Sequence, residues 1–213
     1  MTELTLTRRV TARIPTRYGT FSLVLFENNQ DAKQHMAFVM GEVAGAEDLL
    51  LRAHSECFTS DVLGSVRCDC GEQLDRSLQL IGRAQRGAVL YLRQEGRGIG
   101  LLDKLRAYNL QDEGLDTVEA NLRLGHRADE RDYRAAALMI RDLGIRSINL
   151  ITNNPTKIRE LRSLGVVIRR RTAIEVAARP ENAGYLHTKM SRMDHLLQLR
   201  GTFRISQDNL QEI

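Results

Sequence analysis

The feature that most constrains the fold of this 213-residue chain is the order of its apolar patterns between residues 87 and 170. Short apolar runs typical of buried strands alternate there with longer segments of helical period. In chain order the segments are 88–93, 100–114, 128–144, 147–152, 154–165 and 166–170. Parallel strands need long crossover connections, usually helices, so this order predicts an α/β sheet with crossover helices.

The first 54 residues show a different pattern. Four short segments rich in Val, Leu, Phe and Thr are separated by turn residues such as Pro15 and Asn28-Asn29. These segments are 5–14, 19–28, 34–43 and 48–54. We therefore predict a mixed β-sheet whose N-terminal portion is antiparallel. No linker or repeat divides the chain, which predicts one domain over 1–200 and a polar tail over 201–213. The last helix is expected at about 183–200.

Composition narrows the class of protein. The chain has 42% hydrophobic and 27% charged residues, and its longest apolar run is six residues, Ala135–Ile140. A membrane-spanning helix needs about 20 apolar residues, and the N-terminus has no signal-peptide pattern. We expect a soluble, cytoplasmic protein. The net charge is +4, and only four of the 31 basic residues are lysines. Arginine binds phosphate through paired hydrogen bonds, although an arginine-rich genome explains the bulk of these residues equally well.

The three cysteines are clustered. Cys57, Cys68 and Cys70 lie within fourteen residues, in the spacing C-x10-C-x-C. Three thiolates without a fourth fit a metal site with one open coordination position, where water can be activated. A turn that enters a helix at Gly71 would bring Cys68 and Cys70 together. The alternatives are a closed structural zinc site completed by His54, or three buried free thiols.

Two further segments lie where a predicted strand meets a helix. Residues 95–100, EGRGIG, offer backbone N–H groups to an anion, or form a tight connection and nothing more. Residues 152–157, TNNPTK, place Thr152 after a strand and Lys157 in the first turn of a helix. A lysine there opposes the helix dipole, which indicates an anion nearby.

In the helix predicted over 100–114, Leu101, Leu105 and Tyr108 share one face, which by default makes Tyr108 a core residue. In 128–144, Asp129 is expected to cap the helix, with Arg131 in its first turn. The expected inward stripe of that helix is Met139, Ile140 and Leu143.

Taken together, these segments resemble GTP cyclohydrolase II. The matching strings are HSEC-x10-CDCG, QEGR-x-IGL, RAY-x-LQD-x-G-x-DTVEAN, ADERDY and TNNP-x-K, in that order. They extend from about Pro15 to Leu197, which is nearly the whole chain. Each string alone is modestly specific, but five in one order are very specific. No dihydroxybutanone-phosphate synthase segment precedes them, so we expect the stand-alone form of the enzyme.

The resemblance implies an α/β GTP cyclohydrolase II fold and the first step of riboflavin biosynthesis. That reaction is the hydrolysis of GTP to 2,5-diamino-6-ribosylamino-4(3H)-pyrimidinone 5′-phosphate, formate and pyrophosphate. It implies one zinc ion per chain on Cys57, Cys68 and Cys70, magnesium with the GTP phosphates, and a homodimer. Zinc would activate water for attack on C8 of guanine. The residues that match the GTP-contacting set are Arg52, Ala53, His54, Ser55, Glu56, Gln73, Glu95, Gly96, Arg97, Thr117, Thr152 and Lys157.

Three residues match the family's catalytic positions. Tyr108 would assist proton transfer or position water beside the zinc. Arg131 would attack the α-phosphorus of GTP, with Asp129 as its proton acceptor. Arginine is a poor nucleophile because it stays protonated, and a simpler role for Arg131 as an electrostatic clamp on the phosphates fits the same residues.

Two other functions fit parts of the sequence. A paralogue could stop at the formamidopyrimidine nucleotide, after one hydration. A non-catalytic, zinc-stapled binder of nucleotides or nucleic acid would account for the basic charge. A nucleic-acid surface needs aromatic side chains among its cations, and aromatic residues make up only 5% of this chain, with no tryptophan. We therefore expect no nucleic-acid partner and no membrane partner.

Overall fold

The computed structural model describes residues 3–193 and 195–196. In this part of the chain a single sheet has seven strands, in the order β1-β2-β3-β5-β4-β6-β7. The strands are β1 (Leu6–Thr16), β2 (Gly19–Asn28), β3 (His35–Met40), β4 (Leu49–Ser55), β5 (Gly87–Leu92), β6 (Ile148–Ile151) and β7 (Ile168–Thr172).

Strand β5 joins two kinds of sheet. It pairs antiparallel with β3, which continues through β2 to β1 as an antiparallel ladder. On its other edge β5 pairs parallel with β4, and β4, β6 and β7 are parallel to one another. The predicted mixed sheet with an antiparallel N-terminal portion is therefore confirmed.

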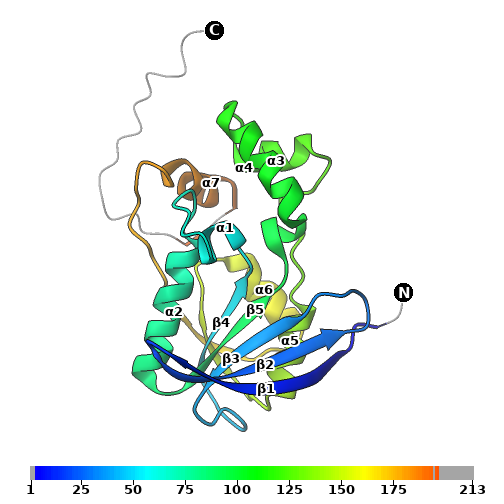
Figure 1. Cartoon of the computed structure of the whole chain (residues 1–213), viewed down its shortest axis with the longest axis vertical. Helices are drawn as coiled ribbons and strands as arrows, with labels where there is room; N and C mark the ends of the chain where they lie inside the picture. The colour runs from blue at the N-terminus through cyan, green and yellow to red at the C-terminus, as the bar shows by residue number, and fades with distance from the viewer. Residues whose placement is uncertain (1–2, 194, 197–213) are drawn as a thin grey trace.

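The helices divide between the faces of the sheet and one of its ends. They are α1 (Phe58–Asp61), α2 (Cys70–Ala84), the 3-10 turn η1 (Glu95–Gly98), α3 (Gly100–Asp112), α4 (Thr117–Arg123), α5 (Arg134–Asp142), α6 (Pro155–Ser163) and α7 (Ala183–Met193). Figure 1 shows α1, α3, α4 and α7 gathered beyond one end of the sheet. Among the described residues, no helix has the length and apolar character needed to cross a bilayer.

The core has two parts because successive side chains of a strand point to opposite faces. On β5, Leu90 belongs to the larger cluster, which α5 and α6 cover with residues such as Met139 and Leu161. Val89 belongs to the smaller cluster, where Ile81 of α2 packs. The sheet is thus covered on both faces, which leaves its ends for a ligand site.

The predicted inward face of 100–114 is wrong. Leu101 is 38% exposed and Leu105 is 45% exposed, whereas the buried residues of α3 are Lys104 and Ala107. Helix α3 lies beyond the end of the sheet and does not pack against the hydrophobic core. The apolar stripe of this helix therefore does not coincide with its buried face.

Three expectations about helix boundaries also change. Helix α4 was not predicted. The sequence signal for it is a capping box, in which the Asp116 side chain accepts a hydrogen bond from the backbone N–H of Glu119. Asp129 is not an N-cap, because α5 begins five residues later, at Arg134. The last helix ends at Met193, and residues 194 and 197–200 of its expected span, with the polar tail 201–213, lie outside the described residues.

Candidate active site

One pocket lies at the edge of the sheet where the parallel strands β4, β5 and β6 end. Cys57 follows β4, Glu95 follows β5 and Thr152 follows β6, and all three line the pocket. Ligand sites of open α/β sheets form at this edge. The pocket brings together all the residues predicted for the site except Ala53 and Asp129. The backbone oxygen of Ala53 accepts a hydrogen bond from Nζ of Lys157, a residue that lines the pocket, at 2.6 Å.

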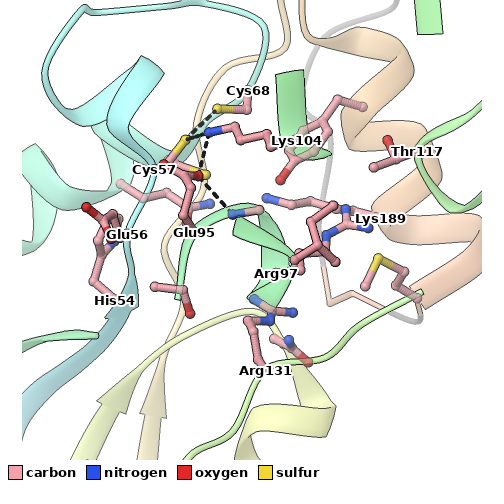
Figure 2. A pocket seen from close by; sticks show the side chains of 18 of the residues that line it. His54, Glu56, Cys57, Cys68, Glu95, Arg97, Lys104, Thr117, Arg131 and Lys189 are labelled. Atoms are coloured by element: carbon pink, nitrogen blue, oxygen red, sulfur yellow. Dashed lines mark hydrogen bonds and ion pairs between the residues drawn. The ribbon is translucent and has the colours of Figure 1, made fainter. Parts of the chain in front are cut away.

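The three cysteines line this pocket, and Figure 2 shows Cys57 and Cys68 close together at one side of it. Cys57 precedes α1, while Cys70 begins α2 and Asp69, between the other two cysteines, occupies its N-cap position. The sulfur atoms lie within 4.8 Å of one another, and the Sγ atoms of Cys57 and Cys68 are 3.6 Å apart. Zn–S bonds of about 2.3 Å in a tetrahedral site place two sulfurs about 3.8 Å apart. The cluster therefore fits a zinc ion held by three thiolates.

Each of these thiols changes the ease with which its neighbours lose a proton. Hydrogen bonds from Cys68 and Cys70, together with the ammonium group of Lys104, lower the pKa of Cys57 to about 3. The hydrogen bond with Cys57 and burial raise the pKa of Cys68. One thiolate thus hinders the next, and a divalent cation would allow all three to ionise.

His54 is not part of the cysteine cluster, so the closed Cys3His alternative is not supported. Its Nε2 lies 2.9 Å from a carboxylate oxygen of Asp61, and both side chains are buried. The same carboxylate accepts from the hydroxyl of Tyr91 at 2.9 Å and from the backbone N–H of Cys57 at 3.0 Å. Asp61 therefore ties His54 and the first cysteine together without bringing the imidazole to the sulfurs.

Tyr108 faces the pocket from α3. Its hydroxyl lies 3.3 Å from Oγ1 of Thr59, and the guanidinium of Arg67 stacks on its ring at 4.5 Å. Burial raises the pKa of this hydroxyl, so it is protonated at neutral pH. A protonated hydroxyl in the pocket can donate a hydrogen bond to a ligand or to water. The default view of Tyr108 as a core residue fails together with the apolar face predicted for α3.

Arg131 and Asp129 form a side-on pair. Arg131 Nε donates to Oδ1 of Asp129 at 2.8 Å and to Oδ2 at 3.1 Å, and its Nη2 also contacts Oδ2. Burial alone would raise the pKa of Asp129, but the hydrogen bonds and charge of Arg131 lower it. Burial likewise opposes the charge of Arg131, but the phenol oxygen of Tyr133 and the hydrogen bond and charge of Asp129 outweigh it and raise the pKa of Arg131. Both groups are therefore charged.

The pocket is strongly basic. The cations among its lining residues are Arg52, Arg67, Arg97, Lys104, Arg131, Lys157 and Lys189. Against these seven cations stand two carboxylates, Glu56 and Glu95. Four of the cations have an acidic partner, through the pairs Arg67–Asp112, Lys104–Glu95, Arg131–Asp129 and Lys189–Asp69.

The other three cations are buried or partly buried without an acidic partner in the described part of the chain. Arg52 donates to the amide oxygen of Gln73 at 2.7 Å. Both terminal nitrogens of Arg97 are buried with no hydrogen-bond partner. Burial and the charges of Arg52 and Arg131 lower the pKa of Lys157 well below its usual range. Buried polar groups are almost always paired, so these donors indicate a site for an anion.

The turn that carries Arg97 is shaped for this role. Gly96 and Arg97 both adopt left-handed backbone conformations, with φ of 63°. A non-glycine residue at positive φ is uncommon and concentrates at functional sites. At Gly98 a Cβ would approach the backbone oxygen of Glu130 to 2.7 Å, so only glycine fits. The glycine-rich segment is therefore more than a tight connection, since it directs an unpaired guanidinium into the pocket.

Sequence reasoning missed several residues of the pocket, among them Lys104, Tyr185, Lys189 and His195. Tyr185 lies beneath the guanidinium of Arg97, whose Cζ is 5.7 Å from the ring centroid. Burial and the cations around His195 lower its pKa to about 3, so this imidazole is neutral. No motif marked these positions. Lys104 and Lys189 can be recognised as inward-facing lysines only when the positions of helices α3 and α7 are known.

Comparison with known proteins places this chain in a family. The model of the GTP cyclohydrolase II family matches residues 7–173. The riboflavin biosynthesis protein RibBA of Salinispora tropica is 54% identical over 187 residues, which are 87% of this chain and 47% of that protein. RibBA of Bacillus mycoides is 50% identical over 197 residues, which are 92% of this chain and 50% of that protein. The chain thus spans about half the length of these relatives.

A solved structure is also similar, at 20% identity and a TM-score of 0.46: the two-domain 3,4-dihydroxy-2-butanone 4-phosphate synthase RibBX from A. baumannii. The alignment covers 80% of this chain and 41% of that one. The family model and the relatives at half identity confirm the resemblance seen in the motifs. The chain belongs to the GTP cyclohydrolase II family.

Proposed function

We propose that this chain hydrolyses GTP to 2,5-diamino-6-ribosylamino-4(3H)-pyrimidinone 5′-phosphate, formate and pyrophosphate, as the first step of riboflavin biosynthesis. One observation carries the proposal: a trithiolate cluster and three cations without an acidic partner face the same pocket of a chain in this family. GTP has a triphosphate for the cations and a ring for the cluster. The proposal includes a homodimer, as the resemblance implies.

Cys57, Cys68 and Cys70 would hold zinc, which supplies an activated water for attack on the guanine ring. Tyr108 stands in the same pocket with its hydroxyl protonated, so it can donate a proton or hold water near the reacting carbon. Glu56 also lines the pocket, and Arg93 holds its carboxylate through a 2.8 Å bond to Oε2. This carboxylate can accept from the N–H groups of guanine.

Arg52, Arg97 and Lys157 would bind the phosphates together with magnesium, which enters with the nucleotide. Arg131 lies among them, already held side-on by Asp129. Its raised pKa keeps the guanidinium protonated and therefore without a free lone pair for attack. The arrangement favours an electrostatic clamp on the phosphates over a covalent nucleophile, with Asp129 fixing the orientation of Arg131.

The test is an analysis of the products that purified protein forms from GTP with zinc and magnesium. We expect formate, pyrophosphate and the diaminopyrimidine in equal amounts. Pyrophosphate without formate, together with a formamidopyrimidine nucleotide, would show a paralogue that stops after one hydration. Binding of GTP with no product at all would show a non-catalytic binder and refute the proposal.

The variant Cys68→Ser tests the chemistry at the guanine ring separately from the chemistry at the phosphates. We expect this variant to lose zinc by elemental analysis and to release no formate, because ring opening depends on the cluster. The phosphate-binding cations are untouched, so pyrophosphate release from GTP, which leaves GMP, should persist. A variant that keeps one zinc per chain and full formate release would refute the metal assignment. If zinc-free protein binds GTP and yet releases no pyrophosphate, either the assignment of two separate sites is wrong or the two steps are strictly coupled.

A further inference from the structure

Lys104 is a buried lysine that touches the cysteine cluster. It is 7% exposed and is, with Ala107, one of the two buried residues of α3. Its Nζ lies 3.1 Å from Sγ of Cys57 and 2.7 Å from Oε1 of Glu95 (Figure 2). The sequence motifs assign it no role, and the proposed mechanism does not use it.

Glu95 holds the lysine in place. Its Oε1 accepts from Lys104 and from the backbone N–H of Gly96 at 2.8 Å, while its Oε2 accepts from the backbone N–H of Phe58 at 2.6 Å. Phe58 follows Cys57 directly, so the contacts form a closed ring from the sulfur of Cys57 to Lys104, to Glu95 and back to the backbone of the cysteine. Such a ring fixes the ammonium group against one particular sulfur.

The charge of the cluster gives this contact a consequence. Three thiolates around a divalent zinc ion carry a net charge of −1, inside a pocket whose cations indicate an anionic substrate. The ammonium group of Lys104 is shared between Glu95 and the sulfur at 3.1 Å, so it offsets part of that charge at a place where screening by water is weak. A hydrogen bond to a charged sulfur also withdraws electron density from it. The other lysine of the pocket, Lys189, bonds to Asp69 at 2.5 Å and has no sulfur contact among the described residues, whereas the ammonium group of Lys104 touches both a carboxylate and a sulfur.

We propose that Lys104 is a positioning residue of the metal centre. It donates a hydrogen bond to the thiolate of Cys57, offsets part of the excess charge of the three thiolates, and so keeps the open position of the metal electron-poor. The inference rests on the metal centre of the proposed function, but its test uses no GTP. A failure of the proposed reaction therefore leaves this test intact.

The test compares Lys104→Met, Lys104→Arg and the exposed control Lys33→Met in protein loaded with Co(II). In Lys104→Met we expect the sulfur-to-cobalt charge-transfer band to move to longer wavelength, because the Cys57 thiolate becomes more electron-rich. In the zinc-loaded form, iodoacetamide should alkylate Cys57 about tenfold faster, since a hydrogen bond to a charged group has been removed. Lys104→Arg should restore both properties in large part, and Lys33→Met should match the wild type.

The inference would be overturned if Lys104→Met binds one metal ion per chain and shows an unchanged charge-transfer band and an unchanged rate of Cys57 alkylation. A merely structural lysine would lower the melting temperature without moving the band of the bound cobalt. If Lys104→Met does not fold, Lys104→Gln replaces it, since an amide can still donate a hydrogen bond but carries no charge. In that variant a band shifted from the wild type toward longer wavelength supports the charge argument, and an unshifted band refutes it.

Discussion

Helices α3 and α5 bury opposite kinds of side chain. Helix α5 turns Ala136, Met139 and Ile140 into the core against the sheet. Helix α3 turns Lys104 inward and leaves Leu101 and Leu105 exposed. The difference follows from what each helix covers: α5 lies on a face of the sheet, whereas α3 lines a polar pocket beyond its end. Burial on α5 serves stability, and burial on α3 serves the site.

The largest expected effect is a loss of stability when a buried side chain of α5 is truncated. Met139 is fully buried, so Met139→Ala should lower the free energy of unfolding by about 2–5 kcal/mol. The matched control on α3 is Leu102→Ala, where a side chain that is 64% exposed is truncated. That change should stay within about 0.5 kcal/mol. Unfolding in urea measures both, and a loss at Leu102 as large as that at Met139 would show that another surface covers α3, such as a second copy of the chain.

The contrast also explains how much of the fold the sequence could predict. The strands, the mixed sheet and α5 follow from apolar periodicity, because a sheet face buries whatever apolar stripe lies on it. Periodicity failed at α3, since Leu101 and Leu105 share a face with no apolar surface opposite them. The N-cap prediction at Asp129 also failed. Aspartate is a residue type that often caps helices, but here its carboxylate binds the side chain of Arg131 instead.

The site was predictable to the extent that motifs marked it. Cys57 and Arg97 stand in strings whose spacing is specific, and the pocket brings these strings together. Lys104 and Tyr185 stand in no such string, and their roles come from contacts between segments far apart in the chain. The contact of Lys104 with Cys57 joins positions 47 residues apart. Single-sequence periodicity carries no information on that pairing.

The next prediction concerns the pocket side of α3. Tyr108→Phe keeps the ring and removes the hydroxyl that lies 3.3 Å from Thr59. If the hydroxyl assists the hydration of guanine, formate release should fall about 10²-fold. The melting temperature should hardly change, because the hydrogen bond is worth about 1 kcal/mol at most. GTP affinity should survive, since the cations bind the phosphates. Near-normal turnover would return Tyr108 to a packing role and leave α3 with Lys104 alone as its contribution to the chemistry.

The smallest effect is expected at Lys157, where α6 combines both kinds of burial. This helix buries Leu161 against the core and Lys157 in the pocket. Because burial and the nearby arginines lower the pKa of Lys157, protonation of the folded protein is costly. Below the ordinary lysine pKa of about 10.4, the unfolded chain binds a proton that the folded chain resists. The contribution of this group to stability therefore rises with pH, from the lowered pKa up to the ordinary one.

Lys157→Met should remove that dependence and raise the free energy of unfolding by about 1 kcal/mol near neutral pH, since a buried amine whose protonation the fold opposes is replaced by an apolar side chain. The gain is modest because the hydrogen bond to Ala53 is lost as well. Pyrophosphate binding, measured by calorimetry, should weaken in the same variant. Leu161→Ala on the same helix should have the opposite pattern: it should lower the free energy of unfolding and leave the pyrophosphate affinity of the folded protein nearly unchanged. A variant Lys157→Met that is less stable than the wild type and binds pyrophosphate equally well would show that this lysine belongs to the core, as the buried residues of α5 do.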